Sequence, residues 1–238
     1  MATYVATDLH GNYEIWKAIQ EYLKEDDTLI YLGDAIDRGD RGWEIFTELL
    51  EDERVVYIKG NHEDMMYQAL TLTGKEAKKA LSHWKLNGGI ETLENMNKVN
   101  PTPKEKAFYL NQIKNMLDCY VYTNAAGEVF FLTHAGCTPD DKYFSLSPAE
   151  SEKSNLWNRD HIYDEWPHDQ KQVYIVHGHT PVQLCIQNKQ FIEGIVREWP
   201  LIYNYGHKIN LDIGTAFSKL AVLYNLDTNS IECAFKGV

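Results

Sequence analysis

Three times in its N-terminal part, the chain passes from a short apolar stretch through a polar loop into a helical pattern. The apolar stretches cover residues 4–7, 28–32 and 55–58, and apolar residues recur at helical spacing after the loops. Repeated units of this kind build a parallel sheet covered by helices, and ligands bind at the carboxyl ends of its strands. The loops at those ends therefore predict one site at one sheet edge.

The rest of the chain changes character twice. From about residue 65 to 117 the pattern is helical and is punctuated by glycine and proline, which predicts a helical insertion in a position to cap the site. Beyond it, runs at 119–123, 129–133, 173–176, 208–213 and 220–224 predict a β-rich second half. Two sheets packed face to face, with helices outside, accommodate both halves. We expect a single domain over residues 1–238, since compact α/β domains reach this length.

The charge of the chain limits its partners. Its formal net charge is −12, whereas generic affinity for nucleic acid comes from an excess of Lys and Arg. We therefore expect no nucleic-acid partner. An acidic protein repels phosphorylated substrates at long range, so a phosphate site would need metal ions or a few well-placed arginines to reverse the local field.

Four cysteines lie far apart with no C-x-x-C pair, which argues against a zinc knuckle or a dithiol redox site. The first apolar stretch leads directly into polar residues and lacks the basic start of a signal peptide. Apolar runs also fall short of membrane-spanning length. These features lead us to expect a cytoplasmic protein without a membrane partner.

Five short polar motifs each follow a predicted strand, and each supplies residues of metal-ligand type. They are Asp8-x-His10-Gly11, Gly33-Asp34-x-x-Asp37-Arg38-Gly39, Gly60-Asn61-His62-Glu63, His134-Ala-Gly136 and Gly178-His179-Thr180-Pro181. Alone, any one could be turn chemistry or a helix cap. Together, carboxylate, amide and imidazole groups suit first-row divalent metals. Two such ions sharing one carboxylate can lower the pKa of a bound water, and Asp34, in the middle unit, is the natural bridge.

In this order, the five motifs resemble those of the PPP-type Ser/Thr phosphatases, members of the calcineurin-like metallophosphoesterase superfamily, and especially the small bacterial and phage enzymes. The similarity runs from residue 4 to about residue 224. It implies a four-layer α/β/β/α sandwich and two divalent ions, with Mn²⁺ expected and Fe, Zn, Co or Ni as alternatives. The resemblance assigns Asp8, His10 and Asp34 to the first ion, and it assigns Asp34, Asn61, His134 and His179 to the second.

Four further residues are expected to turn bound metal into catalysis. By the resemblance His62 is the proton donor to the leaving alkoxide, and Asp37 orients it; an imidazole paired with a carboxylate suits this role. Arg38 can grip phosphate oxygens bidentately. The segment Leu156-Trp157-Asn158-Arg159 is similar to one in phage-type enzymes, which makes Arg159 the second arginine. The alternatives are a loop cap for Asp37 and a surface salt bridge for Arg159.

Other histidines and tryptophans are interpreted as structural. His177 precedes the G-H-T-P histidine by two positions and is predicted to pack or to support a ligand. Trp84 and Trp157 are interpreted as packing residues. Pro181 stands where nucleases and diesterases of the superfamily commonly carry a second histidine, which disfavours diesterase chemistry.

The motifs predict phosphomonoester hydrolysis on phosphoserine or phosphothreonine proteins, with direct attack of a metal-bridging hydroxide on phosphorus and inorganic phosphate as product. A small phosphomonoester is an alternative substrate. The main alternative activity is symmetric hydrolysis of dinucleoside tetraphosphates such as Ap4A; enzymes of that kind usually carry Asp where this chain has Glu63. A catalytically inactive binding module would lack ligands, and none is missing. Substrate choice is expected to reside in the insertion and in the loop 137–155.

Overall fold

The computed structural model describes residues 1–137, 155–162, 172–185, 200–203 and 206–237. Its first five-stranded sheet has the order β10-β9-β1-β2-β3. Strands β1, β2 and β3 run parallel and β9 and β10 join them antiparallel, which confirms the sheet predicted from the three repeats. The bounds are β1 Thr3–Ala6, β2 Thr28–Tyr31, β3 Val55–Tyr57, β9 Leu220–Asn225 and β10 Ser230–Lys236.

The second five-stranded sheet has the order β4-β5-β6-β8-β7. Strands β4 and β5 form the predicted antiparallel hairpin, and β5, β6 and β8 run parallel. The bounds are β4 Cys119–Thr123, β5 Val129–Thr133, β6 Val173–His177, β7 Leu201–Tyr203 and β8 Lys208–Asn210. The short edge strand β7 was not predicted. Strand β8 ends before residue 213 because the chain leaves the sheet at Asp212, whose carbonyl accepts from Val182 N.

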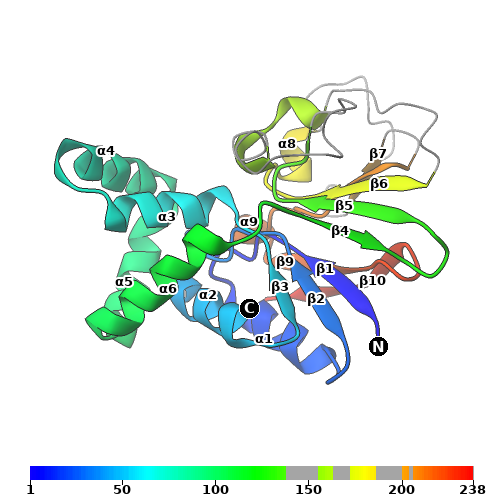
Figure 1. Ribbon diagram of the computed structural model, residues 1–238, viewed down its shortest axis with the longest axis horizontal. Coiled ribbons are helices and arrows are strands. Elements are labelled where there is room, and N and C mark those ends of the chain that lie inside the picture. The colour runs from blue at the N-terminus through cyan, green and yellow to red at the C-terminus, as the bar shows by residue number, and fades with distance from the viewer. Residues whose placement is uncertain (138–154, 163–171, 186–199, 204–205, 238) are drawn as a thin grey trace.

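The two sheets lie one over the other, with helices α1 (Tyr13–Tyr22) and α2 (Gly42–Glu51) against the outer face of the first sheet (Figure 1). Side chains that alternate along the strands fill the cores between these layers. Odd-numbered Val5 points into a core between the two sheets, where it meets residues such as Phe130 and Val176. Its neighbours Tyr4 and Ala6 point the other way, into a second core beneath helices α1 and α2. Successive strand residues face opposite sides, so one short strand serves both cores. The result is the expected α/β fold with two packed sheets.

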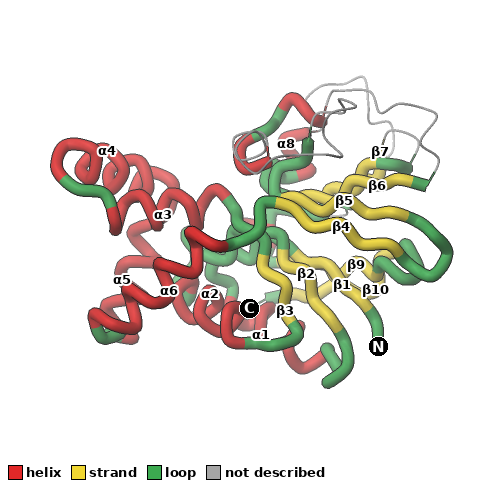
Figure 2. Tube along the Cα trace, in the orientation of Figure 1, coloured by secondary structure: helices red, strands yellow, loops and turns green. Residues whose placement is uncertain are grey.

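Helices also fill the connection between β3 and β4, and they gather beside one end of the two sheets (Figure 2). We call residues 61–115 the helical segment. It contains α3 (Asn61–Thr71), α4 (Gly74–Trp84), the π-helical turn η1 (Lys85–Gly89), α5 (Ile90–Val99) and α6 (Pro103–Asn115). In the described part of the chain, no helix combines the length and apolar character needed to cross a membrane.

Short helices in the described part of the chain include η3 (Asp160–Ile162), α8 (Val182–Cys185) and α9 (Thr215–Ser218). Every predicted metal ligand follows the carboxyl end of a parallel strand: β1, β2 and β3 in one sheet and β5 and β6 in the other. Because the two sheets face each other, these strand ends bring polar loops from both sheets to one place. The fold therefore concentrates the sequence motifs into one site.

Candidate metal centre

The site loops have an unusual backbone. Among the described residues, nine non-glycine residues have a positive φ, and six of them are predicted site residues. These are Asp8 (54°), His10 (44°), Asp34 (59°), Asp37 (73°), Arg38 (66°) and His179 (68°). Such conformations cost about 1–3 kcal/mol each and persist only where surrounding structure enforces them. The sharp turns let successive residues of one loop direct side chains toward the same point.

Two glycines allow the carboxylates to press against backbone. A Cβ atom on Gly60 would lie 2.2 Å from Oδ1 of Asp34, and one on Gly178 would lie 2.0 Å from Oδ2 of Asp8. Real Cβ atoms do not tolerate such approaches. Glycine is therefore required at both positions if Asp34 and Asp8 are to keep these orientations.

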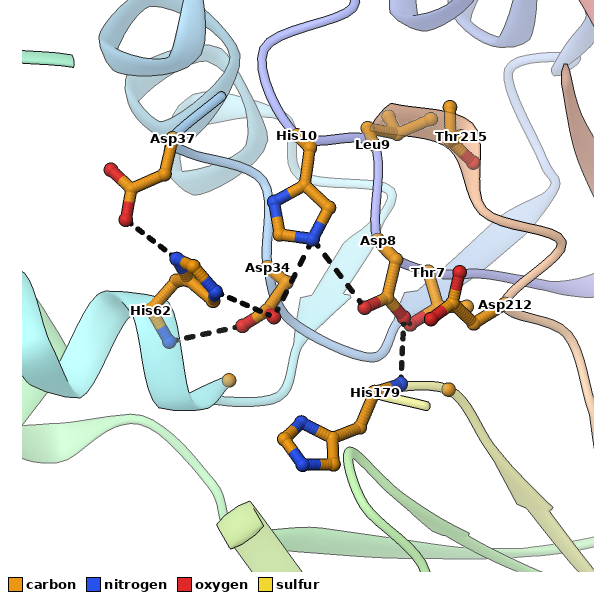
Figure 3. Close-up of polar contacts among 12 residues, drawn as sticks. Thr7, Asp8, Leu9, His10, Asp34, Asp37, His62, His179, Asp212 and Thr215 are labelled. Carbon is orange, nitrogen blue, oxygen red and sulfur yellow. Dashed lines mark hydrogen bonds and ion pairs between the residues drawn. The ribbon is translucent and has the colours of Figure 1, made fainter. Parts of the chain in front are cut away.

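Asp34 lies between two groups of buried histidines, with His10 and His62 in the first group and His134 and His179 in the second. Figure 3 shows Asp34 with His10, His62 and His179. Its Oδ2 is 3.7 Å from Nε2 of His10 and 3.7 Å from Nε2 of His62. Its Oδ1 is 3.4 Å from Nε2 of His134. One carboxylate thus presents each of its oxygens to a different group, which is the geometry required of a ligand shared by two ions.

On the side of the first group, Asp8 lies beside His10. Nδ1 of His10 donates to the carbonyl of Ile36 at 2.9 Å, which leaves Nε2 as the lone pair, 3.8 Å from Oδ1 of Asp8. Oδ2 of Asp8 accepts from Thr7 Oγ1 at 2.5 Å and from the backbone N–H of His179 at 3.1 Å. Oδ1 of Asp8 is buried without a hydrogen-bond partner in the described part of the chain. A buried carboxylate oxygen without a donor is costly, and a cation would satisfy it.

The second group combines Asn61, His134 and His179. Nδ1 of His134 donates to the carbonyl of Leu32 at 2.7 Å, so Nε2 carries the lone pair when the ring is neutral. That nitrogen lies 2.9 Å from Oδ1 of Asn61, which also carries no proton. Nδ1 of His179 lies 2.9 Å from the same amide oxygen and 3.2 Å from Nε2 of His134. Acceptors converging in this way need a cation or a shared proton between them.

The charges of the site point in the same direction. Burial disfavours a charged imidazole at His134, but Asp34 and Asp8 outweigh burial and raise its pKa to about 10. The two carboxylates therefore favour a positive charge beside them at His134. A divalent ion can supply that charge instead of a proton. Oxygen ligands mixed with imidazole suit first-row divalent metals. The residues present therefore fit a pair of such ions.

His62 and Asp37 form a buried pair beside these groups. Nδ1 of His62 lies 2.6 Å from Oδ2 of Asp37, and both side chains are at most 2% exposed. The backbone N–H of His62 donates to Oδ1 of Asp34 at 3.0 Å. Because Asp37 holds the Nδ1 proton, Nε2 is the nitrogen that faces Oδ2 of Asp34.

The two arginines are both exposed but make different contacts. The guanidinium of Arg38 is 2.5 Å from Nε2 of His10 and 3.0 Å from Nε2 of His62, so it spans both rings. Arg159 is exposed. Its positive charge reaches His179, whose pKa is held well below its usual range by burial, by His134 and by Arg159. The neighbouring ring of Trp157, 40% exposed, lies edge-on 6.0 Å from that of His179.

Glu63 has a role that sequence reasoning missed. Its carboxylate is fully buried and accepts from the backbone N–H groups of Asp34, Ala35 and Gly60 at 2.9–3.0 Å and from the Tyr57 hydroxyl at 2.9 Å. These hydrogen bonds connect the loop that contains Asp34 to the loop that contains Gly60. With four donors and no exposed surface, Glu63 does not reach a substrate, so its identity is a poor guide to substrate choice.

Other residues at the site lacked a sequence signal or carried one that was misread. Asp212 lies beside Asp8 (Figure 3), accepts from Gly214 N at 2.8 Å, and has its pKa raised by burial to about 6. Asp212 follows strand β8, just as Asp8 follows β1 and Asp34 follows β2, and this position was the sequence signal that could have identified it.

Trp84, which we interpreted from the sequence as a packing residue, donates its indole N–H to Asp37. His177 lies outside both metal-ligand groups, with its ring packed edge-to-face on His161.

A cavity of about 460 Å³ adjoins the Arg38 loop. Asn12, Tyr13, Arg41 and Lys219 contribute to its lining. Of the two regions expected to choose the substrate, residues 138–154 of the loop lie outside the described part of the chain.

Comparison with known proteins places this geometry in context. Residues 1–210 match the family model of the calcineurin-like phosphoesterases. A candidate diadenosine tetraphosphatase superposes with a TM-score of 0.60 at 14% identity, covering 99% of this chain and 93% of that one.

Two solved phosphatases are also similar. A protein serine/threonine phosphatase from Saccharomyces cerevisiae, similar to human phosphatase PP5, gives a TM-score of 0.59 at 14% identity over 100% of this chain and 80% of that one. A cold-active protein-tyrosine phosphatase of a psychrophilic Shewanella gives 0.56 at 16% identity over 96% and 76%. At such identities the likeness establishes the fold and leaves the substrate open.

Proposed function

This chain belongs to the calcineurin-like phosphoesterase family, and on that premise we propose that it is a phosphomonoester hydrolase acting on phosphoserine and phosphothreonine in proteins. The observation that carries the proposal is the His62–Asp37 pair. The other ring nitrogen of His62, Nε2, lies 3.7 Å from the carboxylate of Asp34, the residue common to both candidate metal groups, and 3.0 Å from the guanidinium of Arg38.

A proton donor in this position suits a poor leaving group. The alkoxide of serine or threonine departs slowly unless it is protonated as the P–O bond breaks, and an imidazole oriented by a carboxylate supplies that proton near neutral pH. Asp37 keeps the Nδ1 proton in place and directs the Nε2 position toward the site. His62 then donates from Nε2 to the leaving oxygen.

Two divalent ions, for which we propose Mn²⁺, would lower the pKa of a water nucleophile and stabilise charge on the phosphoryl oxygens. Six residues would hold them: Asp8, His10, Asp34, Asn61, His134 and His179. Arg38, which contacts both His10 and His62, is placed to donate to phosphate oxygens, and the charge of Arg159 acts on His179 in the same site. Together they orient the phosphate and offset its charge.

Symmetric hydrolysis of dinucleoside tetraphosphates is the competing function. The fold of a candidate diadenosine tetraphosphatase is similar to that of this chain, which supports this alternative. The sequence preference against it depended on Glu63, which is buried and fully hydrogen-bonded within the protein. An exposed aromatic ring beside the site, that of Trp157, would also suit a nucleobase.

A side-by-side assay separates the two functions. The metal-reconstituted protein is offered phosphoserine, phosphothreonine and phosphotyrosine peptides and, separately, diadenosine tetraphosphate. The proposal predicts a higher kcat/KM on the phosphoserine or phosphothreonine peptides. Preferential conversion of the dinucleotide to two nucleoside diphosphates would overturn the substrate assignment, and preference for phosphotyrosine would overturn its serine and threonine component.

A further inference from the structure

Two buried side chains of the helical segment, Trp84 and Thr92, donate hydrogen bonds to Asp37. The indole Nε1 of Trp84 donates to both oxygens of Asp37, at 3.0 Å to Oδ1 and 2.9 Å to Oδ2. The hydroxyl of Thr92 donates to Oδ1 at 2.7 Å. Trp84, Thr92 and Asp37 each have 0% exposure. Together with His62, three side-chain donors therefore surround one buried carboxylate.

Backbone contacts fix the same loop. The N–H of Asp37 donates to Thr92 Oγ1 at 2.9 Å, and the N–H of Arg38 donates to the carbonyl of Gly88 at 3.1 Å. Gly88 lies in the π-helical turn η1 with φ 99°, and a Cβ atom there would come within 2.8 Å of Arg38 Cγ. π-helical turns are common at functional sites. Here the turn brings the Gly88 carbonyl against Arg38, which itself has a strained positive φ.

A carboxylate can rotate about its Cβ–Cγ bond, and only some rotations present an oxygen to the imidazole. Donors on both oxygens remove that freedom, because rotation would break bonds to Trp84 and Thr92 in a place without solvent to replace them. The bond from Asp37 Oδ2 to His62 is thereby held in one geometry. Positioning of this kind matters for catalysis because small misplacements of a reacting group are expensive.

We propose that Trp84 and Thr92 are positioning residues that lock the Asp37 carboxylate against His62, so that the helical segment sets the direction of the proton donor. This inference rests on the proposed function, in which His62 protonates the leaving group. It gives the helical segment a catalytic purpose distinct from the capping role expected from its sequence.

Two conservative variants remove the lock. Trp84→Phe deletes the indole N–H and keeps a buried aromatic ring, and Thr92→Val deletes the hydroxyl and keeps the shape. The matched control is Trp16→Phe, since Trp16 is equally buried and donates its indole N–H at 2.8 Å to a carboxylate far from the site, that of Glu48. Thr92→Ser restores a hydroxyl and serves as the rescue.

Leaving-group dependence reports on the proton donor. In the metal-reconstituted protein, Trp84→Phe and Thr92→Val should lower kcat on a phosphoserine peptide about ten-fold, with KM nearly unchanged. Their kcat on p-nitrophenyl phosphate should fall much less, because nitrophenolate leaves without a proton. Trp16→Phe should change neither, and Thr92→Ser should recover most of the loss.

A second readout needs no turnover. In the metal-free protein, the proton of a buried imidazole Nδ1–H held by a carboxylate resonates far downfield in the NMR spectrum. Asp37→Asn identifies that resonance for His62 by removing it. Trp84→Phe and Thr92→Val should shift or broaden the resonance, and Trp16→Phe should leave it in place.

His62→Asn separates the two levels of inference. If His62→Asn fails to depress the phosphoserine reaction more than the p-nitrophenyl phosphate reaction, the proposed acid, and not the lock, is refuted. If it does depress that reaction selectively while folded Trp84→Phe and Thr92→Val retain wild-type ratios and an unshifted resonance, the lock is refuted. Should Trp84→Phe fail to fold, Thr92→Val decides alone.

Discussion

Nδ1 of His62 lies 2.6 Å from Oδ2 of Asp37, the pair that we propose orients the proton donor. Asp37→Asn should therefore lower kcat on a phosphoserine peptide by about a hundred-fold while leaving bound metal unchanged, because Asp37 belongs to neither metal-ligand group. Steady-state kinetics with metal analysis of the same sample measures both. Loss of metal together with activity would show that Asp37 acts through the ions instead.

Asp34 faces both metal-ligand groups, whereas Asp8 faces one. Asp34→Asn should therefore weaken binding of both ions, and Asp8→Asn should weaken one. Titration calorimetry of the metal-stripped variants with Mn²⁺ distinguishes these outcomes. Equal effects of the two substitutions on stoichiometry would argue against Asp34 as the shared ligand.

Glu63 accepts four hydrogen bonds, three of them from backbone groups of the Asp34 and Gly60 loops. Glu63→Gln replaces one acceptor oxygen with a donor and should lower the free energy of unfolding by about 2–3 kcal/mol. Urea unfolding measures this. The ratio of phosphopeptide to dinucleotide activity should not change. A reversal of that ratio would show that Glu63 does influence substrate choice.

Asp27 offers a test of pH dependence away from the site. Burial alone would raise its pKa, but hydrogen bonds from the backbone N–H groups of Lys24 and Ala2 lower it below the ordinary 3.8. A lowered folded-state pKa stabilises the protein above pH 3.8, and that stabilisation is lost as pH falls through the folded value. Asp27→Asn should cost about 1 kcal/mol at pH 7, with the difference shrinking in acid unfolding measurements. A pH-independent difference would contradict this.

The parts of the fold and site that the sequence predicted are those encoded locally. A strand, a glycine and a ligand lie within a few residues in each N-terminal motif, so the parallel arrangement of β1 to β3 and the clustering of their loops followed from strand ends. The approach of His134 to Asp34 was predicted only by the family resemblance. Two packed sheets were predicted from the β-rich second half and from the family resemblance. The three-residue strand β7 was missed because so short an edge strand shows no alternation.

Residues that hold the site residues in place were missed because they come from distant parts of the sequence. Trp84 and Thr92 are 47 and 55 residues from Asp37 in the chain, and no local pattern indicates that a helical turn returns to that carboxylate. Glu63 was next to the motif, but its role depends on backbone donors from a different loop, that of Asp34. Long-range hydrogen bonds of buried side chains become visible only when the fold is known.

We propose that the Asp34 site hydrolyses a phosphomonoester only when divalent metal is bound. The direct measurement is release of inorganic phosphate from a phosphoserine peptide by metal-stripped protein as Mn²⁺ is added. Activity should rise from near zero and saturate at about two ions per chain. Release that persists after the metal is removed, or its absence from fully loaded protein, would contradict the account.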